Sequence, residues 1–125
     1  MKEKLVKLAY DECSTLVGSQ LINCNYASGA LFLSLLANNK KIKIAFDWIY
    51  CFRVIDEGDL LKMQEEQKGE MVAGIYTILH SPYLKWFNEQ SADIHAKEGV
   101  VHYSIVTIED VIDVLSLVPP VISSE

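Results

Sequence analysis

An alternating run of apolar residues between positions 41 and 55 constrains the fold of this chain more than any other feature. Every even position from 42 to 54 is apolar or aromatic: Ile42, Ile44, Phe46, Trp48, Tyr50, Phe52 and Val54. Successive side chains of a strand point to opposite faces, so this period of two predicts a β-ribbon with one buried face. At about 3.3 Å per residue the run would span roughly 50 Å, too long for one straight strand in a small domain. We therefore expect the ribbon to bend, to carry a bulge or to serve two sheets in turn.

The length and composition predict one folded domain that spans residues 1–125. Half of the residues are hydrophobic and 22% are charged, which excludes a disordered chain. The longest uncharged apolar stretch, residues 29–37, is too short for a membrane-spanning helix, which needs about 20 residues. Residues 1–5 mix charge with apolar side chains and lack the apolar core of a signal peptide. We expect a cytoplasmic protein whose cysteines, Cys13, Cys24 and Cys51, stay reduced.

The remaining segments predict an α+β domain. Helical spacing of apolar residues, or a helix start signal, marks three segments: 4–17, 60–67 and the segment that follows Ser81-Pro82. Strand patterns mark four more: 19–25, 29–37, 71–80 and 99–107. Asn38-Asn39 tolerates the left-handed backbone of a tight hairpin and joins the second of these strands to the long ribbon.

The segment 108–117 fits a helix as well as a strand. An acidic first turn and helical spacing favour a helix, whereas its valine and isoleucine content favours a strand. We favour a turn at Glu109-Asp110 followed by a strand. The expected fold is a bent, mainly antiparallel sheet of about six strands, arranged as a meander or half-barrel, with two or three packed helices.

The charge distribution favours a basic partner. The net charge is −6, and residues 44–125 hold fourteen acidic and only five basic residues. Such a surface repels phosphate backbones, so we expect no nucleic-acid binding. Three carboxylates, Asp56, Glu57 and Asp59, end the ribbon, and with Trp86 they form a candidate surface for a basic protein. The alternative is that the three carboxylates form a solvated turn and that Trp86, with Tyr83 and Phe87, packs in the core.

Arg53 and His102 are the candidate ligand-binding residues. Arg53 is the only arginine in the chain, and a guanidinium in a pocket would bind a carboxylate or phosphate through two parallel hydrogen bonds. The alternative is an internal ion pair with Asp47, Asp56 or Glu57 that holds the bent ribbon. His102 falls between apolar strand residues and would contact the same anion.

The sequence predicts no catalytic residue, no metal site and no cofactor. None of the three histidines stands beside another histidine or a cysteine at the spacing of metal ligands. The chain contains no nucleophile elbow, phosphate-binding loop or dinucleotide fingerprint. We therefore expect a binding protein rather than an enzyme.

Four segments resemble small uncharacterised bacterial proteins, some of which are similar to immunity proteins of bacterial toxin systems. The segments are residues 17–22, the stretch from Ile42-Lys43-Ile44 to Phe52-Arg53, residues 81–87 and residues 102–107. The resemblance implies a bacterial, cytoplasmic α+β protein and transfers no site residue.

Two function hypotheses follow from these observations. The first is a non-catalytic protein-binding module of immunity type that neutralises a basic toxin by covering its active site. The second is a small half-barrel protein that binds an anionic ligand or acts on it as an enzyme. A homo-oligomer that pairs through an open sheet edge is a third option.

Overall fold

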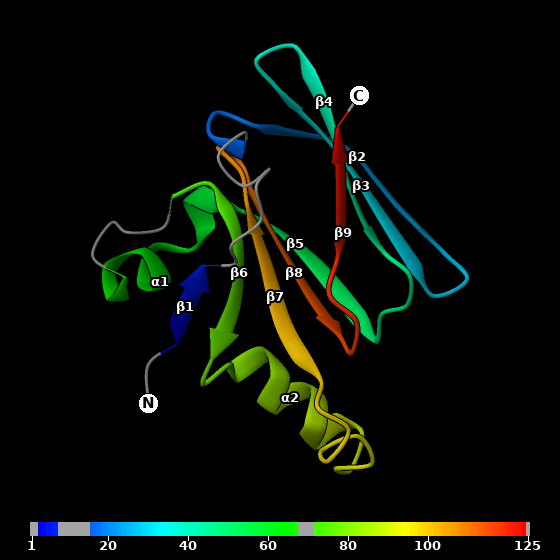
Figure 1. The fold of residues 1–125 in the computed structure, drawn as a ribbon. Helices are drawn as coiled ribbons and strands as arrows, with labels where there is room; N and C mark the ends of the chain where they lie inside the picture. Colours follow the sequence, from blue (N-terminus) through cyan, green and yellow to red (C-terminus); the bar gives the residue numbers. More distant parts are fainter. Residues whose placement is uncertain (1–2, 8–15, 68–71, 125) are drawn as a thin grey trace.

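The protein folds into two antiparallel β-sheets and two short helices (Figure 1). The computed structural model describes residues 3–7, 16–67 and 72–124. In chain order its elements are β1 (Lys4–Lys7), β2 (Gln20–Ala27), β3 (Ala30–Ala37), β4 (Lys40–Phe46), β5 (Cys51–Asp56), the 3-10 turn η2 (Glu57–Asp59), α1 (Leu61–Glu66), β6 (Gly74–Leu79), α2 (Pro82–Gln90), β7 (Val101–Val106), β8 (Asp110–Ser116) and β9 (Val121–Ser124).

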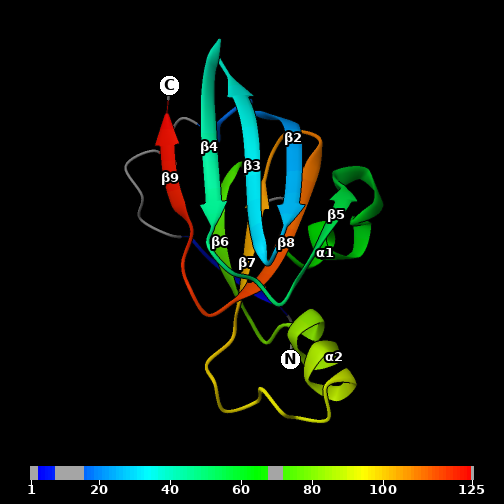
Figure 2. The same ribbon diagram turned by 90° about the vertical axis from the view of Figure 1, so that its right-hand side faces the viewer.

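The two sheets stack face to face (Figure 2). Sheet A has the strand order β1-β6-β7-β8-β5, sheet B has the order β2-β3-β4-β9, and all of the pairings are antiparallel. The main core lies between the sheets and joins Leu33 and Ile44 of sheet B to Ile105 and Ile112 of sheet A, all at most 1% exposed. On β3 buried and exposed residues alternate, so sheet B buries only its inner face.

Sheet A is the middle layer of the molecule. Nearly every residue of β7 and β8 is buried, whichever face it occupies. The outer face is covered because α1 and α2 both lie on the side of sheet A away from sheet B (Figure 1). A second apolar cluster, which includes Tyr76 and Val111, packs there against Leu60 and Met63 around α1.

The expected α+β fold with a single bent sheet of about six strands and two or three packed helices is wrong. The described residues form a mostly β protein with nine strands in two sheets, and α2 is their only helix of more than two turns. The long ribbon does serve two sheets in turn: β4 belongs to sheet B and β5 to sheet A. Between them the alternation breaks, because Trp48 is 46% exposed and Ile49 is buried.

Two of the other local predictions are confirmed and one is wrong. The hairpin at Asn38-Asn39 is confirmed, with φ of 51° and 66°, and so is the strand after Glu109-Asp110. The predicted helix over residues 4–17 is wrong at its start, because Lys4–Lys7 pair with β6; residues 8–15 lie outside the described residues.

In the part of the chain that is described, no helix has the length and apolar content to span a bilayer.

Candidate ligand-binding groove

The candidate site lies on the outer face of sheet A, in two adjacent rows of paired residues. Arg53 pairs with Asp113 across β5 and β8, and Asp113 pairs with Ser104 on β7. In the next row Leu115 of β8 stands opposite His102 of β7. Directly paired residues share a face, so Arg53 and Asp113 point away from the main core, toward the helices.

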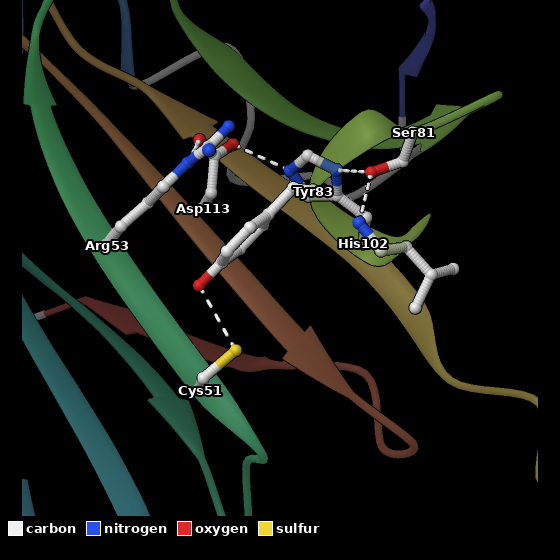
Figure 3. Close-up of polar contacts among 7 residues, drawn as sticks. Cys51, Arg53, Ser81, Tyr83, His102 and Asp113 are labelled. Carbon is white, nitrogen blue, oxygen red and sulfur yellow. Dashed lines mark hydrogen bonds and ion pairs between the residues drawn. The ribbon is translucent and has the colours of Figure 1, made fainter. Parts of the chain in front are cut away.

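Asp113 is a buried carboxylate with two donors (Figure 3). Its side chain is 5% exposed; Oδ2 accepts a 2.8 Å hydrogen bond from Arg53 Nε, and Oδ1 lies 2.7 Å from His102 Nε2. Burial raises the pKa of Asp113, but the hydrogen bonds and positive charges of His102 and Arg53 outweigh it and leave the pKa below its usual value. The carboxylate is therefore ionised at neutral pH and acts only as an acceptor.

These roles define a chain of hydrogen bonds that ends at α2. Since ionised Asp113 can only accept, His102 carries a proton on Nε2 and donates it to Oδ1 of Asp113. Ser81 Oγ shares a 2.6 Å hydrogen bond with His102 Nδ1 and also accepts from the backbone N–H of Leu84 at 3.0 Å. Ser81 is the N-cap of α2, with Pro82 as the first helical residue, as the sequence predicts. The cap thus links the helix to the buried pair.

Arg53 is supported on two sides. Its Cζ lies 4.1 Å from the centroid of the Tyr83 ring, a cation–π contact, while Nε is held by Asp113. Tyr83 in turn donates through its hydroxyl to Cys51 Sγ at 3.2 Å and stacks on Trp86, with ring centroids 6.0 Å apart and planes 11° apart. The Arg53 side chain is 40% exposed, and the bond through Nε leaves the two terminal nitrogens for other acceptors.

Two adjoining hollows meet at Arg53, and we call them together the groove. The first, of about 620 Å³, is lined by Glu3, Cys51, Phe52, Arg53, Pro82, Tyr83 and Trp86. The second, of about 440 Å³, is lined by Glu3, Arg53, Asp59, Leu60, Lys62, Met63, Glu66 and Pro82. Each volume lies in the range of small-molecule sites. The groove therefore runs from α2 to α1 across β5, and three residues, Glu3, Arg53 and Pro82, border both of its halves.

Glu3 places a half-buried carboxyl group in the groove, beside both hollows. Burial raises the pKa of its carboxyl, and the nearby charge of Asp113 raises it further, while His102 and Arg53 oppose the rise. The Glu3 backbone carbonyl accepts a 2.8 Å hydrogen bond from Gln67 Nε2, which joins this end of β1 to the end of α1. A perturbed carboxyl beside an arginine in a cleft is typical of functional sites.

The two predicted ligand-binding residues are brought together, but in different roles. Arg53 lines both hollows, whereas His102 is 1% exposed and reaches the groove only through Asp113. The alternative of an internal ion pair is also realised, although its acid is Asp113 rather than Asp47, Asp56 or Glu57.

Two of the four predicted partner-binding residues line the groove. Asp59 lines the second hollow, and Trp86, which is 51% exposed, lines the first. The Asp56 carboxylate accepts from Gly58 N at 2.8 Å and stabilises η2, in which Glu57 is half-buried. Asp59 and Trp86 thus share one groove with Arg53 between them.

Sequence reasoning missed Asp113 and the role of Ser81. A signal for Asp113 was present, because it is the only charged residue within the apolar run from Val111 to Leu115, and a buried carboxylate requires a partner. Ser81 was identified as a helix cap and nothing more. Glu3 carries no local signal at all, since only the fold brings it beside Arg53.

Ser81, His102 and Asp113 are the residue types of a nucleophilic triad, but their setting favours a supporting role. Ser81 is 9% exposed and its Oγ already caps α2. The residue after a nucleophile commonly supplies an N–H to the oxyanion, and here that residue is Pro82, which has none. We therefore interpret the chain of hydrogen bonds as the element that holds Arg53.

No metal site accompanies the groove. Within residues 3–7, 16–67 and 72–124, no group of three or more histidine, cysteine, aspartate or glutamate side chains is placed to hold a metal ion.

Comparisons with protein-family models, curated proteins and solved structures found no match for this chain.

Proposed function

We propose that this protein binds a ligand that carries a carboxylate, and that the groove between α1 and α2 is the binding site. The observation that carries the proposal is the arrangement of Arg53: Nε is held by Asp113, the guanidinium lies over Tyr83, and the side chain remains 40% exposed. A guanidinium held in this way loses little side-chain entropy when its remaining N–H groups bind an anion.

The aromatic half of the groove adds a preference for an apolar or aromatic group next to the carboxylate. Phe52, Tyr83 and Trp86 line the first hollow together with Arg53. Apolar walls with a few convergent polar groups are the usual composition of a ligand pocket. A ring on the ligand would extend the stack that Trp86 already forms with Tyr83.

A protein partner is the second candidate, and the shared position of Asp59 and Trp86 favours it. The groove joins an exposed tryptophan to the carboxylates Asp59 and Glu66, a combination suited to a basic segment of another protein. This proposal keeps the immunity-type role that the sequence suggests. Charge reversal at Asp56, Glu57 and Asp59 would weaken such a complex most at low salt.

The experiment for the primary proposal is an NMR titration of the ¹⁵N-labelled protein with 3-indolepropionate and with its neutral alcohol analogue. We expect the acid alone to shift the side-chain N–H signals of Arg53 and Trp86. Arg53→Gln should abolish these shifts, whereas Lys41→Gln removes one positive charge from an exposed position on β4 and should leave them unchanged. Equal shifts with acid and alcohol, or none with either, would overturn the proposal.

A further inference from the structure

We infer that the ligand of the groove is a zwitterion, an α-amino acid with an aromatic side chain. Its carboxylate would bind Arg53, its ammonium would bind Glu3 and its ring would lie on Trp86. The inference rests on the proposed function, since it keeps Arg53 as the anchor of the carboxylate and adds a second charged contact.

The first argument is the placement of opposite charges at the junction of the two hollows. Glu3 and Arg53 are the two charged residues that border both halves of the groove. Arg53 already has its own buried carboxylate in Asp113, so Glu3 is not required to fix the guanidinium. The ammonium and carboxylate of an α-amino acid are attached to one carbon, and adjacent groups of opposite charge would receive both.

The second argument is the electrostatic environment of Glu3. Its carboxyl is half-buried, and two further acids, Asp113 and Glu66, lie near enough to raise its pKa in addition to the effect of burial. A bound cation would stabilise the ionised form of such a group. An ammonium supplies that charge together with three N–H donors, whereas a simple carboxylic acid would add a further negative charge beside Glu3.

The third argument is the shape of the first hollow. Pro82, Tyr83 and Trp86 come from the first turns of α2 and line the hollow, and the rings of Tyr83 and Trp86 are stacked nearly parallel. An aromatic side chain attached to the same carbon as the two charged groups would stack on the Trp86 ring. The volume of about 620 Å³ has room for one amino acid.

The experiment is isothermal titration calorimetry of the full chain with four probes: L-tryptophan, N-acetyl-L-tryptophan, L-tryptophanamide and 3-indolepropionate. L-Tryptophan should bind most tightly, and blocking or removing either charged group should weaken binding by about tenfold or more. Glu3→Gln should weaken L-tryptophan by a similar factor and leave 3-indolepropionate unchanged. Arg53→Gln should weaken both, and Glu65→Gln, an exposed carboxylate on the same helix as Glu66, should weaken neither. Thermal unfolding of each variant checks that it is folded.

The outcomes separate this inference from the proposal on which it rests. If N-acetyl-L-tryptophan binds as tightly as L-tryptophan in an Arg53-dependent way, the zwitterion is wrong and the carboxylate site stands. Unchanged affinity of L-tryptophan for the Glu3→Gln variant would also overturn the ammonium contact. If none of the four probes binds the folded wild-type protein, both proposals fail.

Discussion

Replacing Asp113 with alanine should destabilise the fold strongly. The substitution removes the acceptor of both Arg53 Nε and His102 Nε2. The two donors differ in what they lose. His102 is 1% exposed, so its N–H would remain buried without a partner, whereas half-exposed Arg53 can turn to water.

The expected loss of unfolding free energy follows from this difference between the two donors. An orphaned buried donor costs about 1–3 kcal/mol, and a solvent-screened ion pair contributes only about 0.2–1 kcal/mol. Removing one member of a buried charged pair has cost about 3–5 kcal/mol in other proteins. We expect a loss of about 3 kcal/mol, a large share of the roughly 5–15 kcal/mol by which a domain is stable. For a chain of this size that lowers Tm by about 10 °C.

Urea unfolding at pH 7, followed by circular dichroism, measures this loss. Asp113→Asn should cost less, about 1–2 kcal/mol, because the amide oxygen still accepts from His102 while its NH₂ group faces the Arg53 donor. Asp47→Ala serves as the control, because Asp47 is exposed and should change stability by no more than about 0.5 kcal/mol. If Asp113→Ala costs no more than this control, the buried hydrogen bonds of Asp113 do not stabilise the fold and the argument for a rigid Arg53 fails.

The same contribution should depend on pH. The pKa of Asp113 is lowered in the folded protein, so the folded state favours the ionised form more than the unfolded state does. The stabilisation is therefore complete above the unfolded pKa of about 3.9 and is lost as the pH falls through the folded value. The difference in unfolding free energy between wild type and Asp113→Ala should therefore shrink below about pH 4. A difference that grows as the pH falls below about 4 would contradict this assignment.

Three further substitutions test the surroundings of the groove and the core. Ser81→Ala removes the cap of Leu84 N and the hydrogen-bond partner of His102 Nδ1, and should cost about 1–2 kcal/mol in urea unfolding; a neutral result would mean that the cap is dispensable. Gly29→Ala should lower Tm, because the position has φ of +86° and a Cβ would lie 2.8 Å from Trp48 Cδ1; an unchanged Tm would contradict both the backbone strain and the close contact with Trp48. Ile112→Ala in the main core should cost about 2–5 kcal/mol, and a loss below about 1 kcal/mol would contradict tight packing there.

Features set by neighbouring residues could be predicted from the sequence. The β3–β4 hairpin follows from an apolar run, an alternating strand and the left-handed tolerance of Asn38-Asn39 between them. The start of α2 follows from Ser81-Pro82. In each case a few adjacent residues carry the whole signal, because the interactions that stabilise the turn or the helix start lie within the same segment.

Features that depend on residues distant in the sequence could not be predicted from the sequence. The first strand shows helical spacing, but pairing of Lys4–Lys7 with β6 decides its structure. The period of two continues from β4 into β5, and the sequence does not show that the intervening turn moves β5 into the other sheet. The number of sheets depends on which strand edges meet, and side-chain alternation carries no information about that choice.

The candidate site shows the same division. Arg53 and His102 stood out by residue type, but their common partner, Asp113, is 60 positions beyond Arg53 and is brought there by the register of β5 and β8. A charged residue within an apolar strand can be recognised in the sequence as one that needs a partner. The identity of that partner is a property of the sheet.

The buried chain of hydrogen bonds from Ser81 to Arg53 also explains how one exposed arginine could serve as a selective anchor. A free arginine samples many rotamers and would lose that freedom on binding. Here the loss has already occurred on folding, because Asp113 holds Nε and Tyr83 supports the guanidinium plane. His102 and Ser81 extend the support to the N-terminus of α2, which also carries Tyr83 and Trp86. The charged contact and the aromatic wall of the groove are thus held by one set of hydrogen bonds, so a ligand would meet both in a fixed relative position.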